Sequence, residues 1–514
     1  MVKPFKLFLI LTGLIAVLAA ISFLMPREGL KIGSYTFRYP TVDRMMGFDS
    51  ASHPSSFYLH PELAMLDHLL DSITEGNSLD TSFLWSGVDS IFFAADTVPS
   101  QLTDTTISSQ PTSTSITVDI LKNRLVPIQF PDSSHAALSS FFSALVSGKS
   151  NSTQIRVMHY GDSQIEGDRI TSFLRLRLQT RFGGTGVGLL HAVPHSYQPG
   201  AVYQTASSNW RQILVADLAR GAVGHRFGLL GGYSAFTQTK SKQKGGFNEA
   251  WIRFERRGKH SNPRNFKQCR IFYGHSDEPF MLSLKYGGKA QDGEMIAPSS
   301  SMQQISWEIP QSENTFQLNF KGDESPLVYG VSLESPTGII VDNIAIRGSS
   351  GIDFTRADDK SLREALQLVK PKLVILQFGV NVVPHIVDSY KYYENQMYRQ
   401  IKAIKMASPS TSVLLIGVSD MSQRREGQYV SYPNIEQIRD AQRQAALRAG
   451  AAFWDCYEAM GGNNSMPAWA FATPPLASKD FVHFTLRGSK LIAEMFYSSL
   501  MESFREFEAN AIKE

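Results

Sequence analysis

The clearest indication of the fold is the stretch Arg156-Val-Met-His-Tyr-Gly-Asp-Ser163, together with the segment from Glu166 to Phe182 that follows it. Its first five residues favour a β-strand, and Gly161-Asp162-Ser163 favours a tight turn. The following segment has the apolar spacing of one helix face at Ile170, Phe173, Leu174 and Leu178. The sequence therefore predicts a strand, a turn and a helix in direct succession.

The last third of the chain repeats this alternation. Continuous apolar runs predict buried parallel strands at Leu373–Phe378, Ser412–Val418 and Ala451–Trp454. Strands that alternate with helices predict an α/β fold with a doubly wound, mostly parallel sheet. The helices are expected at Lys360–Val369, Ile386–Met406, Asn434–Ala449 and about Leu486–Phe507.

Between these two parts the pattern changes to short alternating runs separated by Gly, Pro, Asn and Asp. About 140 residues of this kind predict a β-sandwich or jelly roll inserted into the α/β domain. The aromatic residues Trp251, Trp307 and Phe320 suit the core of this sandwich better than a sugar-stacking face. The runs are Ala250–Glu255, Met281–Tyr286, Ile305–Ile309 and Phe316–Phe320.

The amino terminus predicts a membrane segment. Lys3 and Lys6 precede Leu7–Met25, an apolar run of about 19 residues that nearly spans a bilayer core at about 1.5 Å per residue. The run continues past Ala19 and Ala20, where cleavage would fall, which favours an uncleaved anchor over a removed signal. The two lysines place this end in the cytoplasm, so we expect a periplasmic body held at the inner membrane, or a secreted body if the segment is cleaved.

Composition shifts divide the chain into five parts. The stretch Asp104–Ser115 is rich in Ser and Thr and is typical of a linker, whereas residues 29–96 suggest no chemistry. The predicted parts are an anchor or signal segment at 1–28, an extension with the linker at 29–120, the first part of the α/β domain at 121–192, an inserted carbohydrate-binding-like β-sandwich at 193–336 and the second part of the α/β domain at 337–514.

Charge and cysteine content exclude several classes of protein. The 50 Lys and Arg residues nearly balance the 47 Asp and Glu residues, without the basic surface that nucleic-acid binding needs. Cys269 and Cys456 stand far apart and form no metal-ligand motif, so we expect two unpaired cysteines. His191, His195 and His385 are isolated as well, and the sequence predicts neither a metal nor a cofactor.

Two short segments predict a hydrolytic site. Ser163 stands where a parallel strand ends and a helix begins, which is the edge at which α/β sheets bind ligands. In Asp480-Phe-Val-His483 a carboxylate precedes a histidine by three residues and can orient its ring toward the serine hydroxyl. Ser163, His483 and Asp480 are therefore the predicted nucleophile, base and orienting carboxylate. We expect Asp162 to brace the turn and His159 to be packed inside the strand.

Two further segments supply donors for a developing oxyanion. Asn381 follows the predicted strand Leu373–Phe378 and should emerge at the same sheet edge as Ser163, where its side-chain amide can donate. Gly348 can present its backbone N–H without a side chain in the way. Together with the N–H of Ser163, these groups form the predicted oxyanion hole.

The order of these motifs resembles that of the SGNH hydrolases, a GDSL-like family with a flavodoxin-like α/β fold. The resemblance assigns the four residues of the family name to Ser163, Gly348, Asn381 and His483. The closest resemblance is to the peptidoglycan O-acetylesterase branch, which also carries an inserted β-sandwich. It rests on His159–Ser163, Leu376–Asn381, Asp480–Thr485 and the junction Gly330–Ser335.

The chain departs from the family pattern at two positions. Gln164 replaces the commoner Leu or His after the serine, and Val382 replaces an acidic residue after the Gly-x-Asn unit. Neither position performs chemistry in the family scheme, so the departures bear on the substrate more than on the mechanism.

The resemblance implies an extracytoplasmic serine esterase that removes acetyl or another small acyl group from an acylated cell-envelope glycan such as peptidoglycan, through an acyl-serine intermediate. Two alternatives stay open. The same residues serve an O-acyltransferase that works with a membrane-bound O-acyltransferase partner, or the chain is a non-catalytic glycan-binding module of the envelope.

Overall fold

The computed structural model describes residues 30–32, 35–37, 125–132, 134–148, 153–194, 198–215, 226–237, 246–258, 261–291 and 293–511. The chain separates into two units, Met1–Phe57 and Tyr58–Glu514. The described part of the first unit is an antiparallel hairpin of β1 (Leu30–Ile32) and β2 (Tyr35–Phe37). Three predictions concern residues outside the described ranges: the membrane segment Leu7–Met25, the linker Asp104–Ser115 and the isolated His195.

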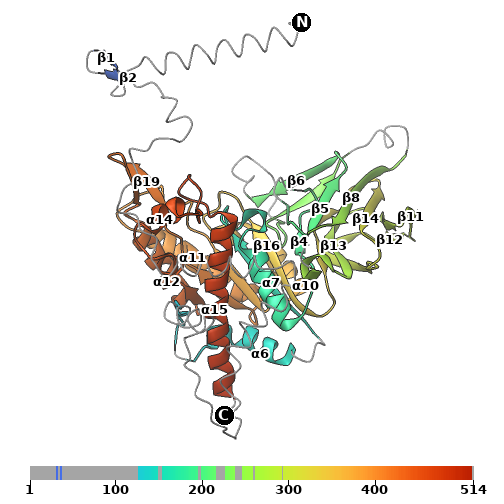
Figure 1. The fold of residues 1–514 in the computed structure, drawn as a ribbon. Helices are drawn as coiled ribbons and strands as arrows, with labels where there is room; N and C mark the ends of the chain where they lie inside the picture. The colour runs from blue at the N-terminus through green and yellow to red at the C-terminus, as the bar shows by residue number, and fades with distance from the viewer. Residues whose placement is uncertain are drawn as a thin grey trace, which may run out of the picture. The chain divides into compact units, whose positions relative to one another are not determined.

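The second unit is built around a five-stranded parallel sheet (Figure 1). Its strand order is β16-β3-β17-β18-β21, which is order 2-1-3-4-5 along the chain, the flavodoxin-like arrangement. The predicted α/β fold with a parallel sheet is therefore confirmed. The strands are β3 (Gln154–Gly161), β16 (Gly338–Ala345), β17 (Leu373–Gln377), β18 (Ser412–Ile416) and β21 (Ala452–Trp454).

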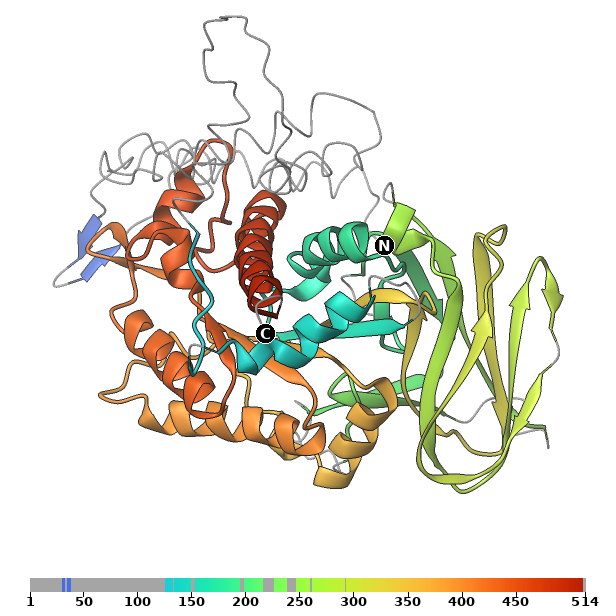
Figure 2. The same cartoon turned by 90° about the horizontal axis from the view of Figure 1, so that it is seen from below.

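Helices cover both faces of this sheet. Figure 2 shows α7 and α15 on one side and α11 and α12 on the other. Each face has its own hydrophobic core, because successive strand residues alternate between them. The first face carries α6 (Ser139–Gly148), α7 (Thr171–Phe182), α13 (Cys456–Met460), α14 (Ser465–Phe471) and α15 (Leu486–Ala511), and the second carries α10 (Asp359–Val369), α11 (Lys391–Ala407) and α12 (Ile435–Arg448).

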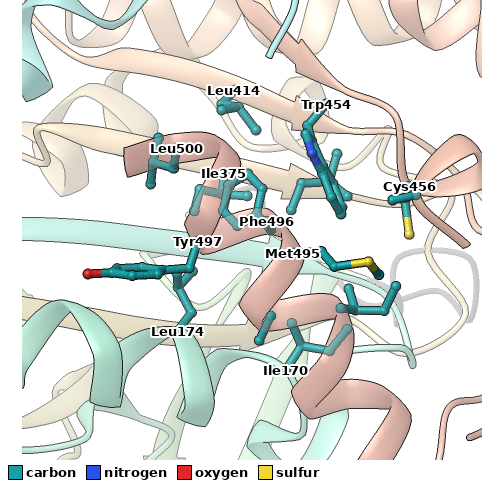
Figure 3. Packing of buried hydrophobic residues seen from close by; sticks show 14 of the residues in the cluster. Ile170, Leu174, Ile375, Leu414, Trp454, Cys456, Met495, Phe496, Tyr497 and Leu500 are labelled. Carbon is teal, nitrogen blue, oxygen red and sulfur yellow. The ribbon is translucent and has the colours of Figure 1, made fainter. Parts of the chain in front are cut away.

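Figure 3 shows the core of the first face from close by. Leu174 of α7 and Leu500 of α15 pack with Ile375 and Leu414 of the central strands, and all four are fully buried. Among the described residues, no helix is both long and apolar enough to cross a membrane.

Two predicted helices begin later than the sequence suggests. The segment from Glu166 is broken into the 3-10 helix η2 (Glu166–Asp168) and α7, because Gly167 and Asp168 adopt φ angles of 69° and 66°. Likewise α11 begins at Lys391 rather than at Ile386. The side chain of Ile386 is 56% exposed, so the apolar pattern there does not face the core.

Two antiparallel sheets follow α7 in the chain, and we call them the sandwich. Their facing sides share one hydrophobic core, as the alternating runs predict (Figures 1 and 2). One sheet contains β11 (Lys289–Ala290), β10 (Phe280–Tyr286), β14 (Thr315–Gly322), β8 (Asn248–Arg256), β5 (Val202–Ala206) and, on β10, β12 (Glu294–Ile296). The other contains β13 (Ser299–Glu308), β9 (Gln268–Ser276), β15 (Leu327–Glu334), β7 (Gly232–Phe236), β6 (Trp210–Leu214) and, on β15, β4 (Gly188–Leu190).

The aromatic and cysteine predictions for this region have mixed outcomes. Phe320 is buried in the sandwich core and Trp307 packs against it. The expectation of a core position is wrong for Trp251, because its position on β8 alternates with those of the core residues. The guanidinium carbon of Arg253 lies 5.6 Å from the centre of the Trp251 ring. Cys269 and Cys456 are both free and buried, as expected.

A buried network of charged residues joins the sandwich to the parallel sheet. Arg156 of β3 contacts Glu334 of β15, and its Nε lies 3.4 Å from an Asp342 carboxylate oxygen on β16. Arg270 of β9 lies 2.8 Å from the other Glu334 oxygen. The side chains of Arg156, Glu334 and Asp342 are at most 1% exposed, so these charges depend on one another for compensation.

Candidate active site

The serine turn is fixed by the carboxylate of Asp162. After β3 ends at Gly161, Asp162 Oδ1 accepts a 3.0 Å hydrogen bond from the backbone N–H of Gln164. Asp162 is 1% exposed, and burial raises its pKa to about 7 against the opposing effect of nearby backbone N–H groups, including those of Gly379 and Val380. The expected bracing role of Asp162 is therefore present as a direct contact.

A second tight turn positions the histidine. Phe481 has a φ of 58°, which is uncommon outside glycine, and its ring stacks on Tyr429 at a centroid distance of 3.9 Å. This turn brings the backbone N–H groups of Val482 and His483 to Asp480 Oδ1, both at 3.0 Å. The side chain of Asp480 thereby organises the turn that carries His483.

Ser163, His483 and Asp480 converge at the end of the parallel sheet. His483 Nε2 lies 2.8 Å from Ser163 Oγ, and His483 Nδ1 lies 2.7 Å from Asp480 Oδ2. Burial acts to raise the pKa of Asp480, but hydrogen bonds from the His483 backbone and ring and from Val482 outweigh it and lower that pKa. The arrangement can pass a proton from the hydroxyl to the ring while an ionised carboxylate holds the ring.

Gln164 connects the two turns, a role that the sequence did not indicate. Its side-chain N–H donates to the backbone carbonyl of Val482 at 2.7 Å and to Ser419 Oγ at 3.1 Å. Gln164 is 3% exposed. A Leu at this position could make neither bond, so the departure from the family pattern has a structural consequence. Val382, the other departure, packs against the core beneath α11.

The loops that carry the predicted oxyanion donors lie against each other. Asn381 follows β17, and its side-chain N–H donates to the carbonyl of Ser349 at 2.8 Å. Gly348 has a φ of 77°, a conformation that favours glycine, and no heavy atom lies within 4 Å of where a Cβ would stand. Arg347 pairs with Glu166 through bonds of 2.7 to 3.0 Å, which ties this loop to the helix after Ser163.

The remaining histidines play other parts. His159 is fully buried, with its ring nitrogens 3.1 Å from Gln377 Oε1 and 3.0 Å from Thr171 Oγ1, and burial lowers its pKa to about 4. The prediction of a packed histidine is confirmed. His385 is exposed, and His191 lines a cleft described below. Within the described ranges, no group of three or more His, Cys, Asp or Glu side chains could hold a metal ion.

Comparisons with known proteins agree with this fold. Residues 320–491 match the GDSL-like Lipase/Acylhydrolase family. A solved peptidoglycan O-acetylesterase is 21% identical and has a TM-score of 0.58, covering 74% of this chain and 99% of its own. Residues 320–491 are thus similar to a GDSL-like lipase/acylhydrolase domain, and the fold is that of the SGNH hydrolases. The matched segment contains Gly348, Asn381, Asp480 and His483, and the structure places Ser163 beside it.

Two other solved structures are less similar. A family two carbohydrate esterase from Clostridium thermocellum is 8% identical with a TM-score of 0.23, covering 50% of this chain and 93% of its own. An acetyl xylan esterase is 17% identical with a TM-score of 0.25, covering 31% of this chain and 81% of its own. Neither likeness is strong enough to support an argument. No curated protein sequence matches the chain.

Proposed function

We propose that the protein is a serine esterase that removes acetyl or another small acyl group from a cell-envelope polysaccharide such as peptidoglycan. The observation that carries the proposal is the hydrogen-bonded series from Asp480 through His483 to Ser163, with distances of 2.7 and 2.8 Å. A serine hydroxyl bonded to an imidazole that a carboxylate orients is the usual form of an activated nucleophile.

In the first half of the reaction, His483 takes the proton of Ser163 as the serine oxygen attacks the ester carbonyl carbon. The negative charge on the carbonyl oxygen is stabilised by the backbone N–H groups of Ser163 and Gly348 and by the amide of Asn381. A side-chain amide has two N–H donors, so Asn381 can hold the Ser349 carbonyl and also donate to the oxyanion.

The tetrahedral intermediate then collapses, and His483 gives its proton to the departing sugar oxygen. The products of this step are the free sugar hydroxyl and an acyl-serine. Water then attacks the acyl carbon while His483 accepts its proton, and the second collapse releases the carboxylic acid and returns the proton to Ser163.

The substrate and the location are proposed on separate grounds. The fold similarity to a peptidoglycan O-acetylesterase and the sequence motifs around Ser163, Asn381 and His483 support an acetylated envelope glycan. The apolar run Leu7–Met25, with lysines before it, supports a body exported across the inner membrane and held there.

The test compares the wild-type chain with Ser163→Ala. We expect Ser163→Ala to lower acetate release from O-acetylated peptidoglycan and from an aryl acetate by at least about 10³-fold, with an unchanged circular dichroism spectrum. An undiminished rate would exclude the proposal. The mass of the glycan is recorded in the same reaction, because a loss of acetyl groups indicates hydrolysis and a gain indicates transfer to a sugar hydroxyl.

A further inference from the structure

A cleft lies beside the turn that carries Ser163, between the parallel sheet and the sandwich. Glu166 and Asp168 of η2 and Asn343 of β16 line one side, and His191 and Val193, which follow β4, line the other. Three hydrogen bonds connect this lining to the turn that carries Ser163. The backbone N–H of Glu166 lies 3.4 Å from the Ser163 carbonyl oxygen, and the Arg169 guanidinium donates to the carbonyls of Ser163 and Glu166 at 2.6 and 2.8 Å.

The wall formed by η2 is held rigidly. Asp168 has a φ of 66° and is 4% exposed, and both of its carboxylate oxygens accept hydrogen bonds from Arg175, at 2.5 and 3.0 Å. Arg175 also donates to the Val341 carbonyl at 2.7 Å. A buried bidentate ion pair thus maintains a backbone conformation that is uncommon for a residue with a side chain, as is typical of functional sites.

The wall formed by the sandwich is held as well. The side-chain N–H of Gln204 on β5 donates to the carbonyls of His191 and Ala192 at 2.7 and 3.0 Å. The amide nitrogen of Gln212 on β6 is 2.9 Å from Nδ1 of His191, and this contact orients the imidazole ring. Residues of the sandwich are therefore fixed at a site close to Ser163.

The lining suits a sugar rather than an acyl chain. The carboxylate of Glu166, the amide of Asn343 and the imidazole of His191 can bond hydroxyl groups, while Leu190 and Val193 can contact the apolar face of a sugar ring.

We propose that this cleft binds the sugar residues next to the acylated hydroxyl, so that the sandwich takes part directly in substrate recognition. The inference rests on the proposed esterase function. It predicts that a glycan ester is bound through the cleft, whereas a small aryl ester reaches Ser163 without it.

The test narrows the cleft with Val193→Trp and uses Met295→Trp as the matched control, because Met295 is also in the sandwich but is 65% exposed and does not line the cleft. For each variant, kcat/KM is measured on O-acetylated glycan oligosaccharides and on p-nitrophenyl acetate. We expect Val193→Trp to lower the ratio of glycan to aryl-ester kcat/KM at least about tenfold, mainly through KM, and Met295→Trp to leave the ratio unchanged.

A binding measurement separates this inference from the esterase proposal. In the Ser163→Ala background, calorimetry with de-O-acetylated glycan oligosaccharides should show weaker binding when Val193→Trp is added. If the glycan binds in this way but no acetate is released by the wild type, the esterase proposal fails and the cleft assignment stands. If Val193→Trp changes neither the ratio nor the binding, or lowers both activities equally in a folded protein, the cleft assignment is wrong.

Discussion

The side-chain amide of Gln164 donates a 2.7 Å hydrogen bond to the backbone carbonyl of Val482. The residue after the serine thus holds the residue before the histidine, and this contact is independent of the bond between Ser163 and His483. Because Gln164 is buried, we expect it to affect the reaction only by positioning neighbouring residues.

Replacing Gln164 by Leu should lower kcat about tenfold and leave KM nearly unchanged. The substitution leaves the part-buried carbonyl of Val482 without its donor, which lowers the stability of the turn carrying His483 by about 1–3 kcal/mol. Steady-state kinetics on an aryl acetate measure kcat and KM separately. Gln164→His, which keeps an N–H donor, should recover part of kcat. A Leu variant with the wild-type kcat would show that the bond does not position the histidine.

Asp480→Asn should lower kcat by about 10² to 10⁴-fold, because a neutral amide cannot stabilise the protonated ring of His483. The variant should also melt at a lower temperature near neutral pH. The pKa of Asp480 is lowered from 3.8, so its contribution to stability is present above that pH and is lost as the pH falls through the folded-state value. The difference in melting temperature between the two proteins should therefore be larger at pH 7 than at pH 3, and an equal difference at both would contradict this.

Asp162 should make the protein less stable as the pH rises from about 4 to about 7. Its pKa is raised from 3.8 to about 7 by burial, so within this window the folded state holds a proton that the unfolded state has lost. Asp162→Asn removes this titration and keeps an oxygen for the Gln164 N–H. The melting temperature of the variant minus that of the wild type should increase across the window, whereas a constant difference would show that Asp162 titrates normally.

Arg156→Met should lower the free energy of unfolding by about 3–5 kcal/mol, because it leaves the buried carboxylates of Glu334 and Asp342 without their shared cation. Arg257→Met is the control. Arg257 pairs with Glu255 at 3.0 Å where both side chains are exposed, and such a pair contributes little to the free energy of unfolding because solvent screens it. Urea unfolding of both variants gives the comparison, and equal losses would contradict the role of the network.

The central sheet could be predicted because its signal is local. Each residue from Leu373 to Gln377 is buried, and the first four are all apolar, as expected for a strand covered on both faces. The spacing from Asp480 to His483 is equally local, and one turn closes it. Both features depend on residues that are neighbours in the chain.

What the sequence could not supply depends on backbone conformation or on distant partners. The break at Asp168 involves a left-handed backbone conformation, and the Asp168 carboxylate bonds the guanidinium of Arg175 in the next helix. Gln164 stood out only as a departure from the family pattern, and its structural role could not be predicted because its partner Val482 is 318 positions away. His191 seemed isolated, since the residues that orient it, Gln204 and Gln212, come from other strands of the sandwich.

The most direct test of the central claim is covalent labelling of Ser163 with a fluorophosphonate, followed by mass spectrometry of the digested protein. Only a serine activated by a neighbouring base reacts quickly with this reagent. We expect an adduct on Ser163 in the wild type and its loss in a folded His483→Ala variant. Absence of the adduct, or equal labelling without His483, would contradict it.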